Sequence, residues 1–295
     1  MKTISIKRLL TSILLASLIA ATAFYGCTDN PGVAPTDGKQ QLDDPSFSKI
    51  RPLLPPNPSF GILETTFIMN PSYSYSIREY GPHGAGWDAI ILWSATDQNH
   101  YRLLDSAQAQ DYYPILGQLY RSYIHDGDSA AIQGQVDVGC AHGVDWFYVD
   151  DGLSESGADS ISKSQIDLVA RIVHRKAGSK WLATGEYVKT RLQSQPSWHD
   201  NVDVIMPYKY DYDPSELDEW FKWVRDNYPS KTLVPFLGYH VEEAGGASQT
   251  GERGDGTGHI EIAQNYSTRI FYYTKGQSDL DEITSYLQEY YGLNN

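Results

Sequence analysis

Two adjacent carboxylates follow a short apolar run near the middle of the chain. Residues 144–149 are Val, Asp, Trp, Phe, Tyr and Val, and Asp150 and Asp151 come directly after them. A short run that is rich in aromatic residues and valine predicts a strand buried on both faces. In parallel α/β sheets and barrels, the C-terminal ends of the strands carry the chemistry. We therefore expect a catalytic acid at the end of this strand.

Strand alternation assigns the side chains of this segment to two faces. Phe147 and Val149 are expected to pack outward against helices, while Tyr148 and Asp150 point inward at the mouth of a barrel. Asp151 then turns into the following loop. It either assists the chemistry or serves as a turn or N-cap carboxylate ahead of the next helix.

A second predicted strand, Trp181–Tyr187, also ends in an acid. Ala183 and Gly185 are small enough to lie against a helix, and this predicts that Glu186 points inward with Thr184. Glu186 would then neighbour the preceding strand's aspartate at the barrel mouth.

A carboxylate pair at this position suits glycoside hydrolysis. A separation of about 5–5.5 Å favours a retaining mechanism, and one of about 6.5–9.5 Å favours inversion. Mutual repulsion and unequal burial keep one acid protonated and the other ionised. We predict Asp150 as nucleophile or charge stabiliser and Glu186 as general acid. The alternative is that Glu186 pairs with Lys189 or Arg191 on the rim.

Other strand ends supply polar side chains to the same mouth. Asp211 follows the sixth predicted strand and either assists as an acid, binds a sugar hydroxyl or caps the next helix. The histidines are scattered rather than spaced as a ligand set, so we predict no metal site. No organic cofactor is implied either. The expected substrate contacts are Gln118, Tyr120, Tyr148, Tyr208, Tyr210, Tyr239 and His240.

The elements that position these residues alternate along the chain. Amphipathic segments at 154–177, 215–228 and 279–291 lie between apolar runs, which indicates a single (β/α)8 TIM barrel of the α/β class. A doubly wound open sheet lacks support because no strand is followed by a glycine-rich dinucleotide loop. The expected strands are Phe60–Met69, Trp87–Ala95, Tyr113–Tyr120, Val144–Asp150, Trp181–Tyr187, Val202–Tyr210, Thr232–Tyr239 and Thr268–Thr274.

The N-terminal segment predicts export. Three basic residues precede an apolar stretch at 9–24 that is too short for a stable membrane span, so residues 1–26 are expected to be a signal peptide. Gly26 directly before Cys27 resembles a bacterial lipoprotein processing site. Lipid attachment at Cys27 would anchor the chain to the cell envelope, at the outer membrane or cell surface, without spanning it. The alternative is simple secretion.

Amino-acid composition indicates the nature of the remaining regions and the kind of binding partner. Residues 27–58 are rich in Pro, Gly and polar side chains and predict a flexible tether before the catalytic barrel domain at 59–295. Removal of residues 1–26 removes three basic residues and no acid, so the net charge moves from −14 to −17. Such a chain does not bind nucleic acid through its overall field. The full sequence has 22 tyrosines and 7 tryptophans, which suit stacking on sugar rings, although they serve equally as core.

Two short motifs resemble carbohydrate-active families. Ile115-Leu116-Gly117 followed by Val149-Asp150-Asp151 resembles the endo-α-1,4-polygalactosaminidase and spherulin-4-like group of (β/α)8 glycoside hydrolases. That resemblance implies that the strand-four Asp150 and a later glutamate, Glu186, act on a carbohydrate substrate.

The second motif, Met206-Pro207-Tyr208, resembles the sixth strand of family 18 chitinases. The chain departs from that family at Asp150-Asp151-Gly152, where the chitinase pattern ends in a catalytic glutamate. The leading hypothesis is thus a glycoside hydrolase acting on a poly- or oligosaccharide. The alternatives are a non-catalytic glycan-binding lipoprotein on a barrel scaffold, and a barrel hydrolase or lyase with a non-sugar substrate.

Overall fold

The computed structural model describes residues 59–63, 77, 79–93, 96, 101–150, 160–178, 180–186, 189–208, 214–239, 257–274 and 277–293. The signal peptide, the tether and Cys27 lie outside the described residues, so the predictions for them remain predictions. Within the described ranges, the structure has no helix that is long and apolar enough to cross a membrane.

All named strands belong to one parallel sheet in the order β7-β6-β5-β4-β3-β2-β1-β9-β8. A parallel bridge between Tyr208 and Phe236 joins the two ends of this order, so the sheet closes. β7 and β8 lie on either side of Val234-Pro235 and together form the seventh strand of the barrel. The strands are β1 (Ser59–Leu63), β2 (Ala89–Leu92), β3 (Ile115–Gln118), β4 (Trp146–Val149), β5 (Trp181–Glu186), β6 (Val204–Pro207), β7 (Thr232–Leu233), β8 (Phe236–Tyr239) and β9 (Arg269–Thr274).

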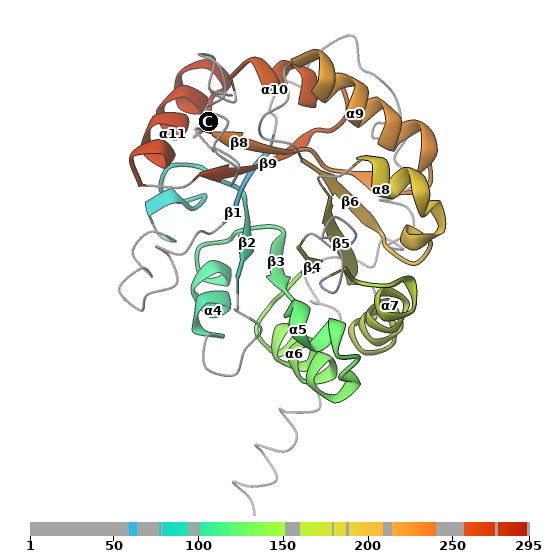
Figure 1. Cartoon of the computed structure of the whole chain (residues 1–295). Coiled ribbons are helices and arrows are strands. Elements are labelled where there is room, and N and C mark those ends of the chain that lie inside the picture. The colour runs from blue at the N-terminus through green and yellow to red at the C-terminus, as the bar shows by residue number, and fades with distance from the viewer. Residues whose placement is uncertain are drawn as a thin grey trace, which may run out of the picture. The chain divides into compact units, whose positions relative to one another are not determined.

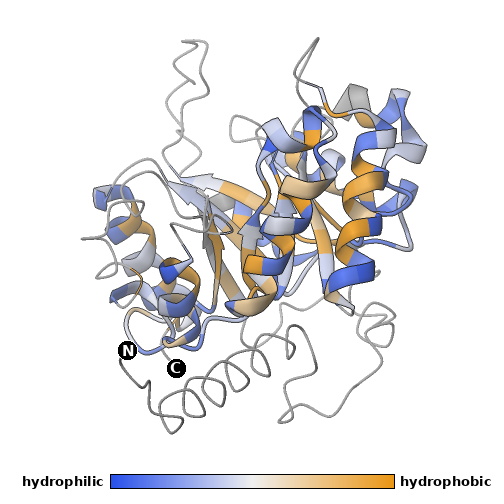
Figure 2. Cartoon of the chain, turned by 90° about the horizontal axis from the view of Figure 1, so that it is seen from below, coloured by the Kyte–Doolittle hydropathy of each residue, from blue (hydrophilic) through white to orange (hydrophobic). Residues whose placement is uncertain are grey.

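Helices surround these strands (Figure 1). Hydrophobic residues occur on the strands and on parts of the helices, while hydrophilic residues occur mainly on the helices (Figure 2). The (β/α)8 prediction is confirmed, with the seventh strand interrupted at a proline that cannot donate to the ladder. The helices are α4 (Arg102–Gln108), α5 (Arg121–His125), α6 (Ser129–Ala141), α7 (Lys163–Ala177), α8 (Lys189–Ser194), η3 (Pro196–His199), α9 (Pro214–Asn227), α10 (Thr257–Gln264) and α11 (Gln277–Tyr291).

Local sequence signals account for the ends of α7. The Ser162 side chain accepts from the Gln165 backbone N–H, and the Gln165 side chain accepts from the Ser162 N–H, which makes a capping box. Gly178 ends the helix with a φ of 60°, a conformation that glycine adopts without strain. The helix predicted at 154–177 therefore begins at Lys163, and residues 154–159 of that prediction lie outside the described residues.

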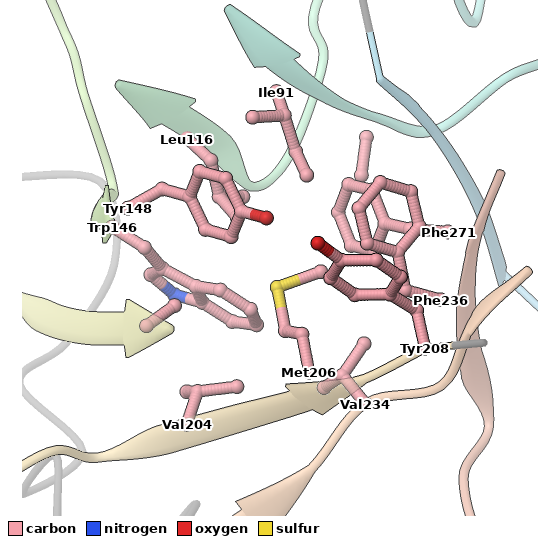
Figure 3. Close-up of a cluster of buried hydrophobic side chains, with 12 residues drawn as sticks. Ile91, Leu116, Trp146, Tyr148, Val204, Met206, Tyr208, Val234, Phe236 and Phe271 are labelled. Atoms are coloured by element: carbon pink, nitrogen blue, oxygen red, sulfur yellow. The ribbon is translucent and has the colours of Figure 1, made fainter. Parts of the chain in front are cut away.

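The inside of the barrel is filled by alternate side chains of its strands (Figure 3). The aromatic residues of this interior are each at most 7% exposed, namely Trp146, Tyr148, Tyr208, Phe236 and Phe271. An added Cβ at Gly61 would overlap the Phe271 ring. The glycine in β1 therefore leaves the room that the Phe271 ring occupies. The inward cluster is Ala89, Ile91, Leu116, Trp146, Tyr148, Ala183, Val204, Met206, Tyr208, Val234, Phe236 and Phe271, with Trp93, Trp181 and Tyr273 packed against it.

Aspartates at the N-terminal ends of alternate strands hold neighbouring strands in register. Asp145 Oδ2 accepts from the Ile115 N–H at 2.9 Å, while the Asp145 N–H donates to the Ile115 carbonyl at 2.8 Å. Asp203 makes the same reciprocal pair with Leu182, at 2.8 Å and 2.9 Å. Asp88 and Phe60 repeat it before β2, at 3.3 Å and 2.9 Å. We call these three pairs the aspartate braces.

The brace at Asp203 has an additional partner in α7. His174 Nε2 lies 2.8 Å from Asp203 Oδ2, and this hydrogen bond raises the pKa of His174 above its ordinary value. A raised histidine pKa adds stability that is fully present below the unfolded pKa, near 6.5, and is lost as pH rises through the folded pKa.

We expect His174→Ala to lower the melting temperature more at about pH 5.5 than at about pH 8.5. Both side chains are partly exposed, so the acid-side loss should be on the order of 0.2–1 kcal/mol. Thermal unfolding followed by circular dichroism at the two pH values measures it. His83→Ala, which breaks the more exposed pair with Asp111, is the matched control and should shift neither melt. Equal losses at both pH values for His174→Ala would contradict the linkage.

Candidate active site at the barrel mouth

Asp150 lies at the C-terminal mouth of the barrel, directly after β4. Trp146 and Tyr148 belong to the inward cluster, and Phe147 packs outward against Gly139 of α6, as strand alternation predicts. The Tyr148 hydroxyl donates to Asp150 Oδ1 at 2.8 Å. The inward direction predicted for Tyr148 is confirmed, and it delivers a phenol to the carboxylate two residues along the strand.

The backbone of Asp150 is held from the neighbouring strand end. Arg121, the first residue of α5, donates from Nη1 to the Asp150 carbonyl oxygen at 3.0 Å. Beside it, the Tyr120 backbone N–H donates to Gln135 Oε1 at 3.0 Å. The turn that carries Asp150 is therefore hydrogen-bonded to the segment that follows β3.

A second tyrosine shares the interior below the mouth. The hydroxyls of Tyr148 and Tyr208 point toward one another, with Met206 beside them (Figure 3). An added Cβ at Gly185 would overlap the Tyr148 hydroxyl and come within 3.3 Å of the Tyr208 ring. Glycine at 185 is thus required for the Tyr148 hydroxyl to cross in front of β5. The prediction that Tyr208 faces inward with Met206 is confirmed.

Two aromatic side chains that the sequence analysis did not single out also pack against the inward cluster. Trp93 follows β2, Tyr273 lies near the end of β9, and both are partly exposed. Burial, followed by the negative charge of Asp150, raises the pKa of Tyr273 above its ordinary value. Tyr273 therefore stays a neutral phenol within the electrostatic reach of Asp150. The sequence pattern could have identified Trp93. Ala89 and Ile91 face inward, and the next residue in this alternation is Trp93.

Gln118 occupies the inward face of β3 next to Tyr148. The register pairs the two residues, and alternation from the inward Leu116 gives Gln118 the same face. Gln118 is 9% exposed, and its Oε1 atom has no hydrogen-bond partner within the described structure. The mouth position predicted for Gln118 agrees with this geometry. Tyr120 is half-buried at the start of α5, with its ring 5.5 Å from that of Tyr123.

The predicted inward direction of Glu186 is wrong. Ala183 belongs to the inward cluster, and the overlap at Gly185 involves two inward tyrosines, so residues 181, 183 and 185 share the inner face. Glu186 consequently points to the outer side of β5, where it is fully buried with Oε1 3.1 Å from His199 Nε2. The small residues of β5 face tyrosines inside the barrel rather than a helix outside it. Asp150 and Glu186 therefore do not form a pair in the mouth.

Glu186 instead belongs to a buried polar group between β5, η3 and the end of α9. The rings of His199 and Tyr228 lie 5.3 Å apart, and burial, followed by the charge of Glu186, raises the pKa of Tyr228 to about 12. His199 Nδ1 and the Tyr228 hydroxyl are buried without a partner in the described part of the chain. The side chains of Lys189 and Arg191, the predicted alternative partners of Glu186, lie outside the described residues.

Five predicted site residues remain. The structure contradicts the prediction for one of them and does not describe the other four. Tyr239 is 4% exposed, and alternation from the inward Phe236 places it on the outer face of β8, not in the mouth. Asp151, Tyr210, Asp211 and His240 lie outside the described residues. Among the residues that are described, no group of three or more His, Cys, Asp or Glu side chains could hold a metal ion.

We expect Gly185→Ala to destabilise the protein by about 1–3 kcal/mol, because the added methyl forces the Tyr148 hydroxyl away from its position. Tyr148→Phe removes the overlapping oxygen, so Gly185→Ala should cost clearly less in that background. Urea unfolding of the two single variants and the double variant measures the coupling. Gly134→Ala is the matched control, since an added Cβ there meets nothing within 4 Å. Strictly additive losses would contradict the placement of Tyr148 across Gly185.

Glu186→Ala should lower the free energy of unfolding by about 1–3 kcal/mol, because it leaves the buried His199 Nε2 without its acceptor. Glu186→Gln keeps an oxygen acceptor at the same reach and should lose less. Chemical denaturation measures both variants. An unchanged midpoint for Glu186→Ala would show that the carboxylate is not held on the outer face as described.

Comparison with known proteins reports on the fold. No protein-family model matches the chain, and no curated protein matches it. A GH18 chitinase from Pseudoalteromonas aurantia is similar over 78% of this chain and 99% of its own, with a TM-score of 0.53 and 8% identity. A psychrophilic family 10 endo-β-1,4-xylanase is similar over 74% and 86%, with a TM-score of 0.50 and 10% identity.

A sugar epimerase appears among the same neighbours. The 3-keto-D-glucoside 4-epimerase of E. coli is similar over 78% of this chain and 98% of its own, with a TM-score of 0.53 and 12% identity. At identities this low, these likenesses establish the (β/α)8 fold that the chain shares with glycoside hydrolases and with other enzymes.

Proposed function

We propose that this chain is a glycoside hydrolase that cleaves a poly- or oligosaccharide at the C-terminal mouth of its barrel. The observation that carries the proposal is the Asp150 carboxylate, hydrogen-bonded by Tyr148 in a mouth lined with aromatic side chains. Aromatic faces stack on sugar rings, and a carboxylate there meets the positive charge that develops at the anomeric carbon. The resemblance of the motifs around Leu116 and Asp150 to the polygalactosaminidase and spherulin-4-like group supports the proposal.

In this proposal Asp150 is the ionised carboxylate, acting as nucleophile or charge stabiliser. The Tyr148 hydroxyl orients it and stabilises its charged form, because a hydrogen bond to the anion favours the anion. The second acid is Asp151 or Asp211, each of which follows a strand that ends at this mouth. Glu186 is not assigned this part, since its carboxylate lies on the far side of β5.

The proposal includes export. The basic and apolar pattern of residues 1–26 supports a signal peptide, and Cys27 is the proposed point of lipid attachment to the cell envelope. The alternative function is a binding-only barrel that holds a glycan through the same aromatic residues without cleaving it. The aromatic lining supports both functions equally, and only the carboxylate chemistry separates them.

The test is hydrolysis over a glycan panel that includes an α-1,4-linked polygalactosamine, followed by reducing-end release and product mass. Asp150→Asn should lower turnover by at least about 100-fold, because the charge that stabilises the transition state is lost. Tyr148→Phe should lower it by about 10-fold or more, because a hydrogen bond to a charged group is lost. Glu186→Gln is the matched carboxylate control and should retain turnover.

Three results would redirect the proposal. Unchanged turnover in Asp150→Asn removes Asp150 from the chemistry. Loss of turnover in a correctly folded Glu186→Gln returns the general-acid role to Glu186. Glycan binding that survives Asp150→Asn, with no product from the wild-type protein, selects the binding-only alternative.

A further inference from the structure

A buried threonine hydroxyl replaces a sheet hydrogen bond at the end of β3. The last register pair between β2 and β3 is Leu92 with Gly117. One residue further along β3, the Thr96 hydroxyl donates to the Gln118 carbonyl oxygen at 2.6 Å. A buried backbone carbonyl needs such a partner, so Thr96 takes over where the pairing with β2 stops.

Gln135 of α6 connects this threonine to the turn that follows β3. Gln135 Nε2 donates to Thr96 Oγ1 at 3.1 Å, and Gln135 Oε1 accepts from the Tyr120 N–H at 3.0 Å. The hydroxyl gives its single proton to the strand carbonyl, so its oxygen is left to accept from the amide. Both side chains are buried. We call Thr96 and Gln135 the turn clamp, because together they hold a carbonyl oxygen and an N–H of one turn.

Gly117 leaves the space in which Thr96 lies. An added Cβ at Gly117 would come within 2.8 Å of Thr96 Cγ2 and within 2.7 Å of Val144 Cγ2, so an alanine there would displace a neighbour. The glycine of the Ile115-Leu116-Gly117 motif therefore admits the threonine whose hydroxyl reaches the next carbonyl of the strand.

The clamped turn in its own right holds the segment that carries Asp150. The Leu119 N–H donates to the Tyr148 carbonyl oxygen at 2.8 Å, and Arg121 Nη1 donates to the Asp150 carbonyl oxygen at 3.0 Å. These two donors lie on either side of Tyr120, the residue whose N–H the turn clamp binds. The Tyr148 hydroxyl donates to Asp150 Oδ1 within the segment so held. Since a hydrogen bond weakens with distance and angle, a shift of the turn would reach this pair.

We propose that Thr96 and Gln135 are positioning residues for Asp150. They fix the β3–α5 turn, and the donors of that turn place the carboxylate at the mouth. This inference rests on the proposed hydrolysis and specifies what keeps its reacting carboxylate in position. The placement matters for rate, because a displacement of about 1 Å can cost about 100-fold in turnover.

Two substitutions of Thr96 separate its hydrogen bonds from its packing. Thr96→Val removes the hydroxyl and keeps a methyl group at Gly117, whereas Thr96→Ser keeps the hydroxyl and removes the methyl group. Gln135→Leu removes the other half of the turn clamp. Thr232→Val is the matched control, because Thr232 is also buried but lies in β7, which begins at the end of the barrel opposite the mouth.

The position of Asp150 is read from the carbon NMR signal of its carboxyl group, assigned by its loss in Asp150→Asn. Tyr148→Phe gives the direction in which this signal moves when the hydrogen bond from Tyr148 is lost. Thr96→Val and Gln135→Leu should move the signal in that direction, while Thr96→Ser and Thr232→Val should leave it unchanged. The double variant should move it by less than the sum of the single shifts, because both substitutions break one clamp.

Kinetics on the cleaved glycan measures the consequence for the reaction. Thr96→Val and Gln135→Leu should lower kcat by about 10-fold or more, with little change in KM, because the misplaced carboxylate acts in the transition state. Thr96→Ser should retain most of the turnover. Urea unfolding verifies that each variant is folded under the conditions of the assay.

The outcomes separate this inference from the proposed hydrolysis. An Asp150 signal that stays unchanged in folded Thr96→Val and Gln135→Leu overturns the positioning role, whether or not glycans are cleaved. A kcat that falls as much in Thr96→Ser or Thr232→Val as in Thr96→Val also overturns it and leaves the hydrolase. The expected signal shifts, without cleavage of any glycan by the wild-type protein, support the placement of Asp150 by the turn clamp and overturn the hydrolase.

Discussion

The aspartate braces determine which side chains reach the mouth. Each brace ties the N-terminal end of an odd strand to the next strand through one backbone and one carboxylate hydrogen bond. A slip of one residue in a strand transfers every side chain to the opposite face. The brace at Asp145 fixes β4 against β3 and so gives Asp150 the inward face. The brace at Asp203 fixes β6 against β5, and with it the outward direction of Glu186.

The size of the inward side chains on one strand limits the size of those on its neighbours. Tyr148 and Tyr208 are large and extend across the space in front of β5, so β5 has room only for Ala183 and Gly185 on that face. Interiors are close-packed, and bulk on one strand requires small residues on the next. The hydroxyl that reaches Asp150 is therefore made possible by the glycine on an adjacent strand. The site therefore depends on β4, β5 and the end of β6 together.

This explains how far the sequence could predict the molecule. The strand positions, the barrel and the inward directions of Asp150 and Tyr208 depend on local periodicity, which the sequence displays directly. Glu186 was assigned to the wrong face because the small size of Ala183 and Gly185 has two explanations, a helix outside or tyrosines inside. Choosing between them requires the register of β4, β5 and β6, and that information is not local. Tyr239 was assigned to the mouth from its place at the strand end, whereas Val234 and Phe236 both face inward and alternation from them puts Tyr239 on the outer face.

Within the described part of the chain, unpaired buried polar atoms occur both on the inward side of the strands and behind the sheet. His199, the last residue of η3, and Glu186 of β5 are fully buried, so a ligand could reach the open His199 Nδ1 only if the surrounding layer moved. Trp93 is partly exposed, and Gln118 lies in the same row as the hydroxyl that contacts Asp150. A natural sequence departs from local consistency mainly where function compensates for the loss of stability. Neither set of unpaired atoms borders accessible surface, so neither by itself identifies a binding site. The carbohydrate hypothesis therefore draws its most specific support from the Asp150 carboxylate at the mouth and the hydrogen bond that Tyr148 donates to it.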